Sequence, residues 1–311
     1  MVDTHYDLLS ICYRCFLRND YSDIEKFSNE IKNSGVKCIF ANLYFMSKEE
    51  MIKELHKNYF DENVSILEMF KKSKRILERF LPNIDFVYSI EGCDYVNISD
   101  LELLYKEGLR SMLLVWNNKN KYGSGNRSKK GLTEFGKRFI NKAIDLGIGI
   151  DLSHANEKTF YDIMEVIKNN KNKGKKVICY ASHSNARVLH NIPRNLTDKQ
   201  LECIKEVDGY VGVISNKYFL DEKKTYEEYS DEYLKHIKYI SKIIGTNRVM
   251  LSTDDMRFAS DIDDIYNYRP IYEYKNIKRN IKTELLKYFN EEEADMILYK
   301  NAYDVYKILK N

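Results

Sequence analysis

Eight short apolar runs recur along the chain, and charged stretches with helical spacing lie between most of them. Apolar runs of strand length that alternate with amphipathic helices are typical of repeated β-α units and of a parallel sheet. The runs are Val2–Leu8, Val36–Phe45, Asp85–Ile90, Ser111–Trp116, Gly147–Leu152, Val177–Ala181, Tyr210–Ile214 and Val249–Thr253. Eight such units favour a closed (β/α)8 barrel of the TIM type over an open, doubly wound α/β sheet.

The segments between the apolar runs predict helices, and several of them carry capping residues. Asn156 and Thr197 precede acidic residues at two helix starts, and Gly35, Gly147 and Gly245 follow helical stretches. The predicted helices are 22–34, 48–80, 99–106, 133–146, 157–170, 197–207 and 233–244, followed by 283–289 and 291–309 after the last strand. Because the chain has only three prolines and no linker composition, we expect one domain over residues 1–311 with extra C-terminal helices.

Composition and charge argue against several classes of protein. The 50 basic and 47 acidic residues give a net charge of +3, which is no strong electrostatic signature for binding nucleic acid or an anionic membrane. The N-terminus lacks a basic segment followed by an apolar core, and no apolar run approaches the ~18 residues of a membrane span. We therefore expect a cytoplasmic protein. The six cysteines are scattered, which favours reduced, structural thiols.

A histidine and an aspartate separated by one residue, His5 and Asp7, belong to the first apolar run. Residues i and i+2 of a strand point to the same side, so an imidazole and a carboxylate at this spacing can bind one ion together. Alone, such a triplet is a weak signal, because a solvated surface pair has the same spacing. Its meaning depends on whether further ligands follow.

Further candidate ligands do follow, at the ends of predicted strands. The carboxyl ends of the strands form the active-site face of a parallel barrel. The polar residues that end the apolar runs there include Glu91, His154, His183 and the pair Asp254-Asp255. A strand-end histidine can instead hydrogen-bond a neighbouring loop. The joint placement of three of the six histidines beside carboxylates nevertheless favours a metal centre.

Two divalent cations could share Glu91 as a bridging ligand. His5 and Asp7 would complete one site, and His154 and His183 the other. Zinc is favoured because imidazole and carboxylate ligands suit it, although manganese, cobalt and iron accept the same ligands.

The remaining histidines and the longer polar loops have other expected roles. His56 is expected on a solvated helix face, and His236 is expected to pack or to support a ligand residue rather than to bind metal. Residues 117–130 are predicted to form a flexible loop, and residues 217–231 and 257–278 are charged or Tyr-rich excursions after strands. Long loops at these places usually build the substrate pocket of a barrel.

The motifs resemble those of the membrane dipeptidase (renal dipeptidase) family, within the wider group of amidohydrolase barrels. The resemblance covers most of the chain. It rests on His5-x-Asp7, Ile90-Glu91-Gly92, Gly131-Leu132-Thr133-Glu134-Phe135-Gly136, Asp151-Leu152-Ser153-His154, Ala181-Ser182-His183-Ser184-Asn185-Ala186-Arg187 and Pro193-Arg194-Asn195-Leu196-Thr197-Asp198.

This resemblance implies a dizinc dipeptidase, usually a homodimer, that cleaves free dipeptides and often tolerates a D-residue at the C-terminal position. By position, Glu91 would bridge the two zinc ions, Asp254 would carry protons, and Arg194 would bind the terminal carboxylate of the substrate. A hydroxide that bridges the two ions would attack the scissile carbonyl. The planar guanidinium of Arg194 matches a carboxylate with two parallel donors.

The sequence departs from the family pattern at two strand ends. After the fourth strand the family has a histidine before an asparagine, where it contacts the substrate carbonyl, whereas this chain has Trp116 before Asn117. An indole N–H can donate a hydrogen bond but cannot carry a positive charge. After the eighth strand, Asp255 follows Asp254 directly, so either aspartate could be the proton carrier.

These departures keep two alternative functions open. One is a metal-binding relative that binds a peptide-like ligand with impaired turnover, and the other is a hydrolase of a different amide or of a lactone.

Overall fold

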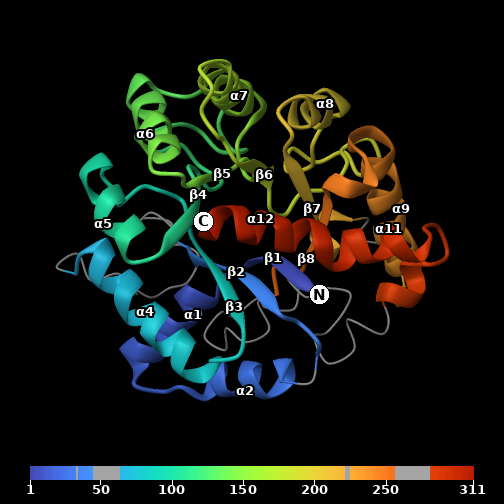
Figure 1. Cartoon of the computed structure of the whole chain (residues 1–311), viewed down its shortest axis with the longest axis horizontal. Coiled ribbons are helices and arrows are strands. Elements are labelled where there is room, and N and C mark those ends of the chain that lie inside the picture. Colours follow the sequence, from blue (N-terminus) through green and yellow to red (C-terminus); the bar gives the residue numbers. More distant parts are fainter. Residues whose placement is uncertain (33, 45–63, 221–224, 256–280) are drawn as a thin grey trace.

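A single eight-stranded parallel sheet forms the centre of the molecule (Figure 1). The computed structural model describes residues 1–32, 34–44, 64–220, 225–255 and 281–311. The strands follow one another in chain order: β1 (Val2–Tyr6), β2 (Cys38–Tyr44), β3 (Asp85–Glu91), β4 (Leu109–Leu113), β5 (Gly149–Asp151), β6 (Cys179–Ala181), β7 (Tyr210–Ile214) and β8 (Val249–Ser252). This order confirms the predicted (β/α)8 barrel.

The seam between β8 and β1 is closed by side chains of β1 as well as by the backbone. Thr4 donates its hydroxyl to Leu251 O of β8 at 3.1 Å and to Ser182 O at 2.7 Å. The buried Asp3 carboxylate accepts the backbone N–H of Thr253 at 3.0 Å. Next to it, the N–H of Asp254 donates to His5 O at 3.3 Å. These contacts bring the carboxyl ends of the first and last strands together.

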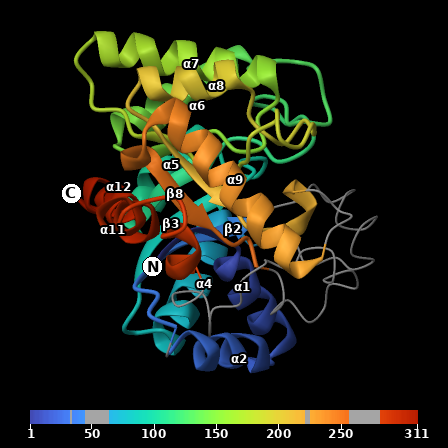
Figure 2. The ribbon, with the colours of Figure 1, turned by 90° about the vertical axis from the view of Figure 1, so that its right-hand side faces the viewer.

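The helices surround the sheet, as Figures 1 and 2 show. Their bounds are α1 (Leu8–Arg18), α2 (Ser22–Ile31), α4 (Ile66–Phe80), α5 (Leu101–Lys106), α6 (Glu134–Asp145), α7 (Glu157–Asn172), α8 (Asp198–Glu206), α9 (Tyr226–Ile244), α11 (Glu291–Asp295) and α12 (Asn301–Lys310). Ser65, Thr133, Asn156, Thr197 and Thr225 each accept a backbone N–H at a helix start. None of the helices in these described ranges has the length and hydropathy of a membrane span.

The first run of the sequence differs from the prediction. The strand expected over Val2–Leu8 ends at Tyr6, and Asp7 occupies the N-cap position of α1, a helix that the sequence analysis missed. The first eight residues of α1 are all buried, as is every residue of β1, so burial does not change where the strand ends and the helix begins. Cys12 and Cys15 are both buried on this helix, and all six cysteines are free.

Other predicted segments also differ in their boundaries or lie outside the described residues. The strand expected over 111–116 is β4, which ends at Leu113. Helix α9 begins at Tyr226 rather than 233, because Thr225 and Glu228 form a capping box, so part of the expected 217–231 excursion is helical. The predicted helical segment 48–63 and the loop 257–278 lie outside the described residues.

The C-terminal helix α12 covers the amino-terminal mouth of the barrel (Figure 1). It follows α11 and a π-helical turn at Met296–Lys300. Ala302, Val305 and Leu309 pack against early strand residues such as Val2 and Cys38. The buried Asn301 side chain donates to Thr246 O at 2.8 Å and to Val249 O at 2.7 Å. The predicted C-terminal helix thus closes the end of the barrel opposite the candidate ligands.

We predict that Asn301→Ala destabilises the protein by about 1–3 kcal/mol, because two carbonyls lose their shared donor at a buried position. Urea unfolding followed by circular dichroism measures this change. The exposed Lys300→Ala on the preceding residue is the matched control and should change the free energy of unfolding by less than about 0.5 kcal/mol. An equally small effect of Asn301→Ala would contradict the assigned role.

Candidate metal centre

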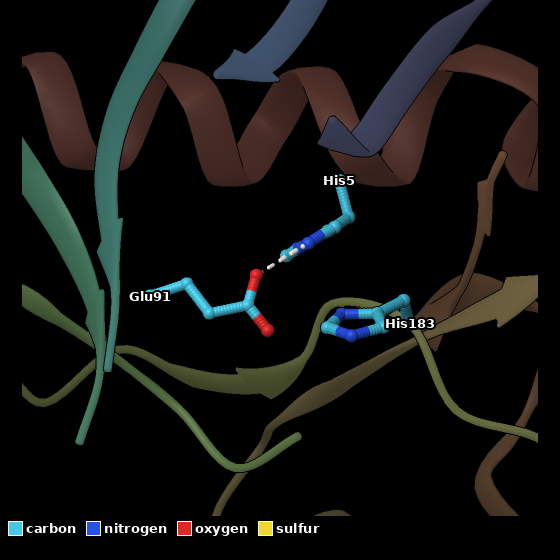
Figure 3. A group of neighbouring side chains, drawn as sticks. All are labelled: His5, Glu91 and His183. Atoms are coloured by element: carbon cyan, nitrogen blue, oxygen red, sulfur yellow. Dashed lines mark ion pairs between the residues drawn. The ribbon is translucent and has the colours of Figure 1, made fainter. Parts of the chain in front are cut away.

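Six ionisable side chains from five strands meet at the carboxyl end of the barrel. His5 lies on β1, Glu91 is the last residue of β3, and His154, His183 and Asp254 lie just beyond β5, β6 and β8. Asp7 follows β1 at the start of α1. Figure 3 shows His5, Glu91 and His183 pointing toward one another from their separate elements. The structure therefore brings together all the metal ligands that the sequence predicted.

The Glu91 carboxylate lies between two of the histidines. Its Oε2 is 2.9 Å from His5 Nε2, and its Oε1 is 3.0 Å from His154 Nε2. Only 2% of Glu91 is exposed, so each oxygen faces one imidazole without competition from solvent. This is the arrangement that a bridging carboxylate requires, with one oxygen toward each side of the site.

His154 and His183 form one pair of donors. Their Nε2 atoms are 2.9 Å apart. The opposite nitrogen of each ring is already held, since His154 Nδ1 is 3.0 Å from Asn117 Oδ1 and His183 Nδ1 is 2.8 Å from Ser182 Oγ. Two nitrogens bound to one tetrahedral zinc ion are about 3.3 Å apart. The two Nε2 atoms, which face each other and Glu91, therefore suit one cation.

His5 and two carboxylates form the other group of donors. His5 Nε2 lies 3.8 Å from Asp7 Oδ1 and 3.9 Å from Asp254 Oδ1. The Asp7 Oδ1 atom is buried and has no hydrogen-bond donor among the described residues. A buried carboxylate oxygen without a donor is costly unless a cation neutralises it. This oxygen therefore fits the role of a metal ligand.

The electrostatics of the cluster follow from its burial. Burial disfavours a charged imidazole at His5, but Glu91, Asp254 and Asp7 outweigh it and raise the pKa of His5 to about 10. Burial and the neighbouring Glu91 raise the pKa of Asp7 well above its usual range. Burial and Arg194 lower the pKa of His154 to about 4, which leaves this imidazole neutral, as a metal ligand must be.

The donor set as a whole fits divalent cations. Donor atoms of His5, Glu91 and His183 lie within 4.8 Å of one another, and so do those of His5, Asp7 and Asp254. His183 also contacts His5 directly, with ring centroids 3.7 Å apart. Imidazole nitrogens and carboxylate oxygens in one buried cluster are ligands that zinc and its neighbours in the first transition row accept.

Two of these residues have left-handed backbone conformations. The φ angle is 67° at His154 and 47° at Asp254, and neither is a glycine. Such conformations are uncommon for non-glycine residues and are concentrated at functional sites. Of the two aspartates after β8, Asp254 is the one whose carboxylate reaches His5, while Asp255 is fully buried.

The Arg194 side chain is buried beside the cluster. It is 7% exposed, it donates to His183 O at 3.0 Å, and its guanidinium lies over the Phe219 ring at 5.1 Å. Its Nε has no hydrogen-bond partner among the described residues. Burial lowers the pKa of Arg194 to about 10, so it stays charged at neutral pH. A buried guanidinium with unused donors suits an anionic group of a ligand.

Trp116 lies at the rim of the site, beyond the end of β4. Its ring is 6.1 Å from the His154 ring and 5.1 Å from the Tyr44 ring. The Arg127 guanidinium lies 5.7 Å from the indole. The adjacent Asn117 contacts His154 Nδ1. Of the two residues predicted to bind substrate, Asn117 therefore supports a candidate metal ligand, and Trp116 lies at the rim.

Sequence reasoning missed two residues that contact the histidines, Ser182 and Asn42. Asn42 on β2 is 1% exposed, and its amide lies 3.0 Å from His5 Nδ1. A lone amide within the predicted strand 36–45 was the available signal. His236 is fully buried and accepts the N–H of Ala186 at 3.1 Å, so it holds the loop after His183, which agrees with the supporting role considered from the sequence.

Comparisons with known proteins point to one family. The model of the membrane dipeptidase family (peptidase family M19) matches residues 31–310. An uncharacterized protein in the pqqA 5′ region of Klebsiella pneumoniae is 31% identical over 222 residues, which are 68% of this chain and 75% of that protein. An uncharacterized dipeptidase of Schizosaccharomyces pombe is 30% identical over 179 residues, or 54% of this chain and 41% of that protein.

Solved structures share the fold. A metallo peptidase from Rhodobacter sphaeroides, liganded with a phosphinate mimic of the dipeptide L-Ala-D-Ala, superimposes with a TM-score of 0.77 at 20% identity and covers 99% of this chain and 98% of that one. A second metallo peptidase, the dipeptidase AC of family M19, has a TM-score of 0.76 at 21% identity over 98% of this chain and 97% of that one.

We predict that Glu91→Gln lowers the affinity for divalent cations at least about 100-fold, because the neutral amide cannot bridge two cations as the carboxylate does. Metal content after dialysis against zinc, measured by plasma emission spectroscopy, tests this. Glu134→Gln, at a side chain that is 85% exposed, is the control and should retain the wild-type metal content. Full metal content in Glu91→Gln would rule out the bridging role.

Proposed function

The chain belongs to the membrane dipeptidase family, and on that premise we propose that it is a dizinc dipeptidase that hydrolyses free dipeptides, including those with a C-terminal D-residue. The observation that carries the proposal is the position of Glu91 between His5 and His154, with Asp7, His183 and Asp254 around it. The solved neighbour that is liganded with a mimic of L-Ala-D-Ala supports the substrate class.

In this proposal Glu91, His5 and Asp7 would hold one zinc ion, and Glu91, His154 and His183 would hold the other. When bound, the two ions would supply a water of low pKa and would polarise the scissile carbonyl. Asp254 takes the proton of the attacking water on its carboxylate and returns it to the leaving amine. Its side chain, 16% exposed beside His5, can reach both the cluster and a substrate.

Arg194 sets the length of the substrate. Its guanidinium would pair with the terminal carboxylate of a dipeptide, because its Nε donor is buried and unpaired among the described residues. The backbone of His183 accepts one of its other donors, which fixes the distance between this cationic group and the cluster. A fixed distance favours a substrate in which one residue separates the scissile bond from the carboxylate.

A second candidate function is favoured by Trp116. A relative that holds cations and binds a peptide-like ligand without turnover would have the same cluster, and the indole replaces the proton-sharing donor of the family. Hydrolysis of another amide or of a lactone is a third reading, in which Arg194 would be dispensable. The homodimer and the cytoplasmic location stay predictions.

We predict that the zinc-loaded protein releases free amino acids from dipeptides and that Arg194→Lys raises KM about 10- to 100-fold, because lysine replaces the paired donors with a point charge. Chromatographic detection of the products measures this. The matching substrate control is a dipeptide amide, which has no terminal carboxylate. The wild-type protein should hydrolyse it poorly, and Arg194→Lys should lower that rate little further. Binding of dipeptides without any release of products would defeat the hydrolase proposal.

We predict that Trp116→His raises kcat about 10-fold or more, because an imidazole can carry the positive charge that stabilises a developing oxyanion. Steady-state kinetics on the best dipeptide substrate test this. Trp116→Phe removes the donor altogether and should be no faster than the wild type. A histidine variant that is no faster than the phenylalanine variant would show that this position does not act on the carbonyl.

A further inference from the structure

One buried serine, Ser182, contacts a candidate ligand from each of the two proposed zinc sites. Its Oγ is 3.1 Å from His5 Nδ1 and 2.8 Å from His183 Nδ1. His5 belongs to one proposed site and His183 to the other. Ser182 is 1% exposed, so solvent does not compete for these contacts.

The backbone of Ser182 is fixed at its N–H and at its carbonyl. Its N–H donates to Asp151 Oδ1 at 3.0 Å, and its carbonyl accepts the Thr4 hydroxyl at 2.7 Å. Burial raises the pKa of Asp151, and its interactions with Ser182 work against this rise. Because Asp151 Oδ1 also accepts the N–H of Ser153, the ends of β5 and β6 are tied to the same carboxylate.

The chemistry of a hydroxyl allows it to serve two imidazoles at once. Its oxygen can accept two N–H donors, and neither contact uses its own hydrogen. A histidine that binds metal through Nε2 must carry its proton on Nδ1 and needs an acceptor there. Ser182 offers that acceptor to both rings.

We propose that Ser182, backed by Asp151, is a shared positioning residue that orients one histidine ligand of each cation site and so couples the two sites. The proposal rests on the proposed function in requiring two cations. Asn117 serves one ring only, since its Oδ1 contacts His154 Nδ1. The Asn42 atom near His5 Nδ1 is the amide nitrogen, a donor that cannot accept the proton of that ring. Loss of Ser182 therefore affects both sites, whereas loss of Asn117 affects one.

The test is a titration of the metal-free full-length protein with Co²⁺, followed by visible absorption and by calorimetry. Ser182→Ala should lower both stepwise association constants about 10- to 100-fold, the usual effect of removing a residue that supports a metal ligand. Asn117→Ala should lower only one of them. Ser184→Ala, a matched change at a fully buried serine that contacts Arg194 but no predicted ligand side chain, should lower neither.

The outcomes separate this inference from the proposed function. A wild-type protein that binds fewer than two Co²⁺ ions overturns both. Two ions in the wild type, with one or both constants unchanged in folded Ser182→Ala, overturn only the role of Ser182. Circular dichroism of each variant shows whether it is folded.

A measurement on the wild-type protein covers the case in which Ser182→Ala does not fold. The chain has six histidines, so their side-chain ¹⁵N resonances can be assigned. With two equivalents of Zn²⁺, the Nδ1 atoms of both His5 and His183 should be protonated and hydrogen-bonded. A deprotonated Nδ1 on either ring would overturn the proposal, because Ser182 could not then accept from both.

Discussion

Three carboxylates lie close together at the carboxyl end of the barrel, and this concentration of negative charge is the main constraint on the candidate site. Asp7, Glu91 and Asp254 approach His5 together, and burial with mutual repulsion raises the pKa of Asp7 and of Asp254. The nearby positive charges of the chain are His5, whose pKa these carboxylates raise against the effect of burial, Arg194 and Arg14, which acts on Asp7. Burying several carboxylates together costs free energy unless positive charge joins them. Divalent cations satisfy this requirement, which is why the cluster makes physical sense as a metal centre.

The fold separates the residues that stabilise the barrel from those that form the site. At the amino-terminal mouth, α12 fills the opening with apolar side chains, and its buried Asn301 donates to the carbonyls of Thr246 and Val249. At the carboxyl mouth, the seam between β8 and β1 is held by Asp3 and Thr4, which places His5 next to Asp254. Because the two ends use different residues, the candidate ligands can change without disturbing the apolar packing at the opposite end.

The sequence predicted the architecture well because the signals that define it are local. Each apolar run is short, several helix starts have a capping residue, and strand ends in a parallel barrel share one face, so the sequence alone was enough to group Glu91, His154 and His183. The β1–α1 junction was predicted wrongly because a fully buried strand is followed after Asp7 by a helix whose first turns are also buried. Periodicity cannot separate strand from helix when both are buried on every side.

The supporting residues could not be predicted for a different reason. Asn42 and Ser182 act through distances that only the closed barrel creates, since they contact His5 from β2 and from the end of β6. Trp116 shows the converse case. The indole lies at the rim with Tyr44 and Arg127, while its neighbour Asn117 keeps its bond to His154. Under the proposed function, a change at position 116 would alter the group near the substrate carbonyl and would leave the contact between Asn117 and His154 in place. Catalysis and metal binding could then change independently at this end of the barrel.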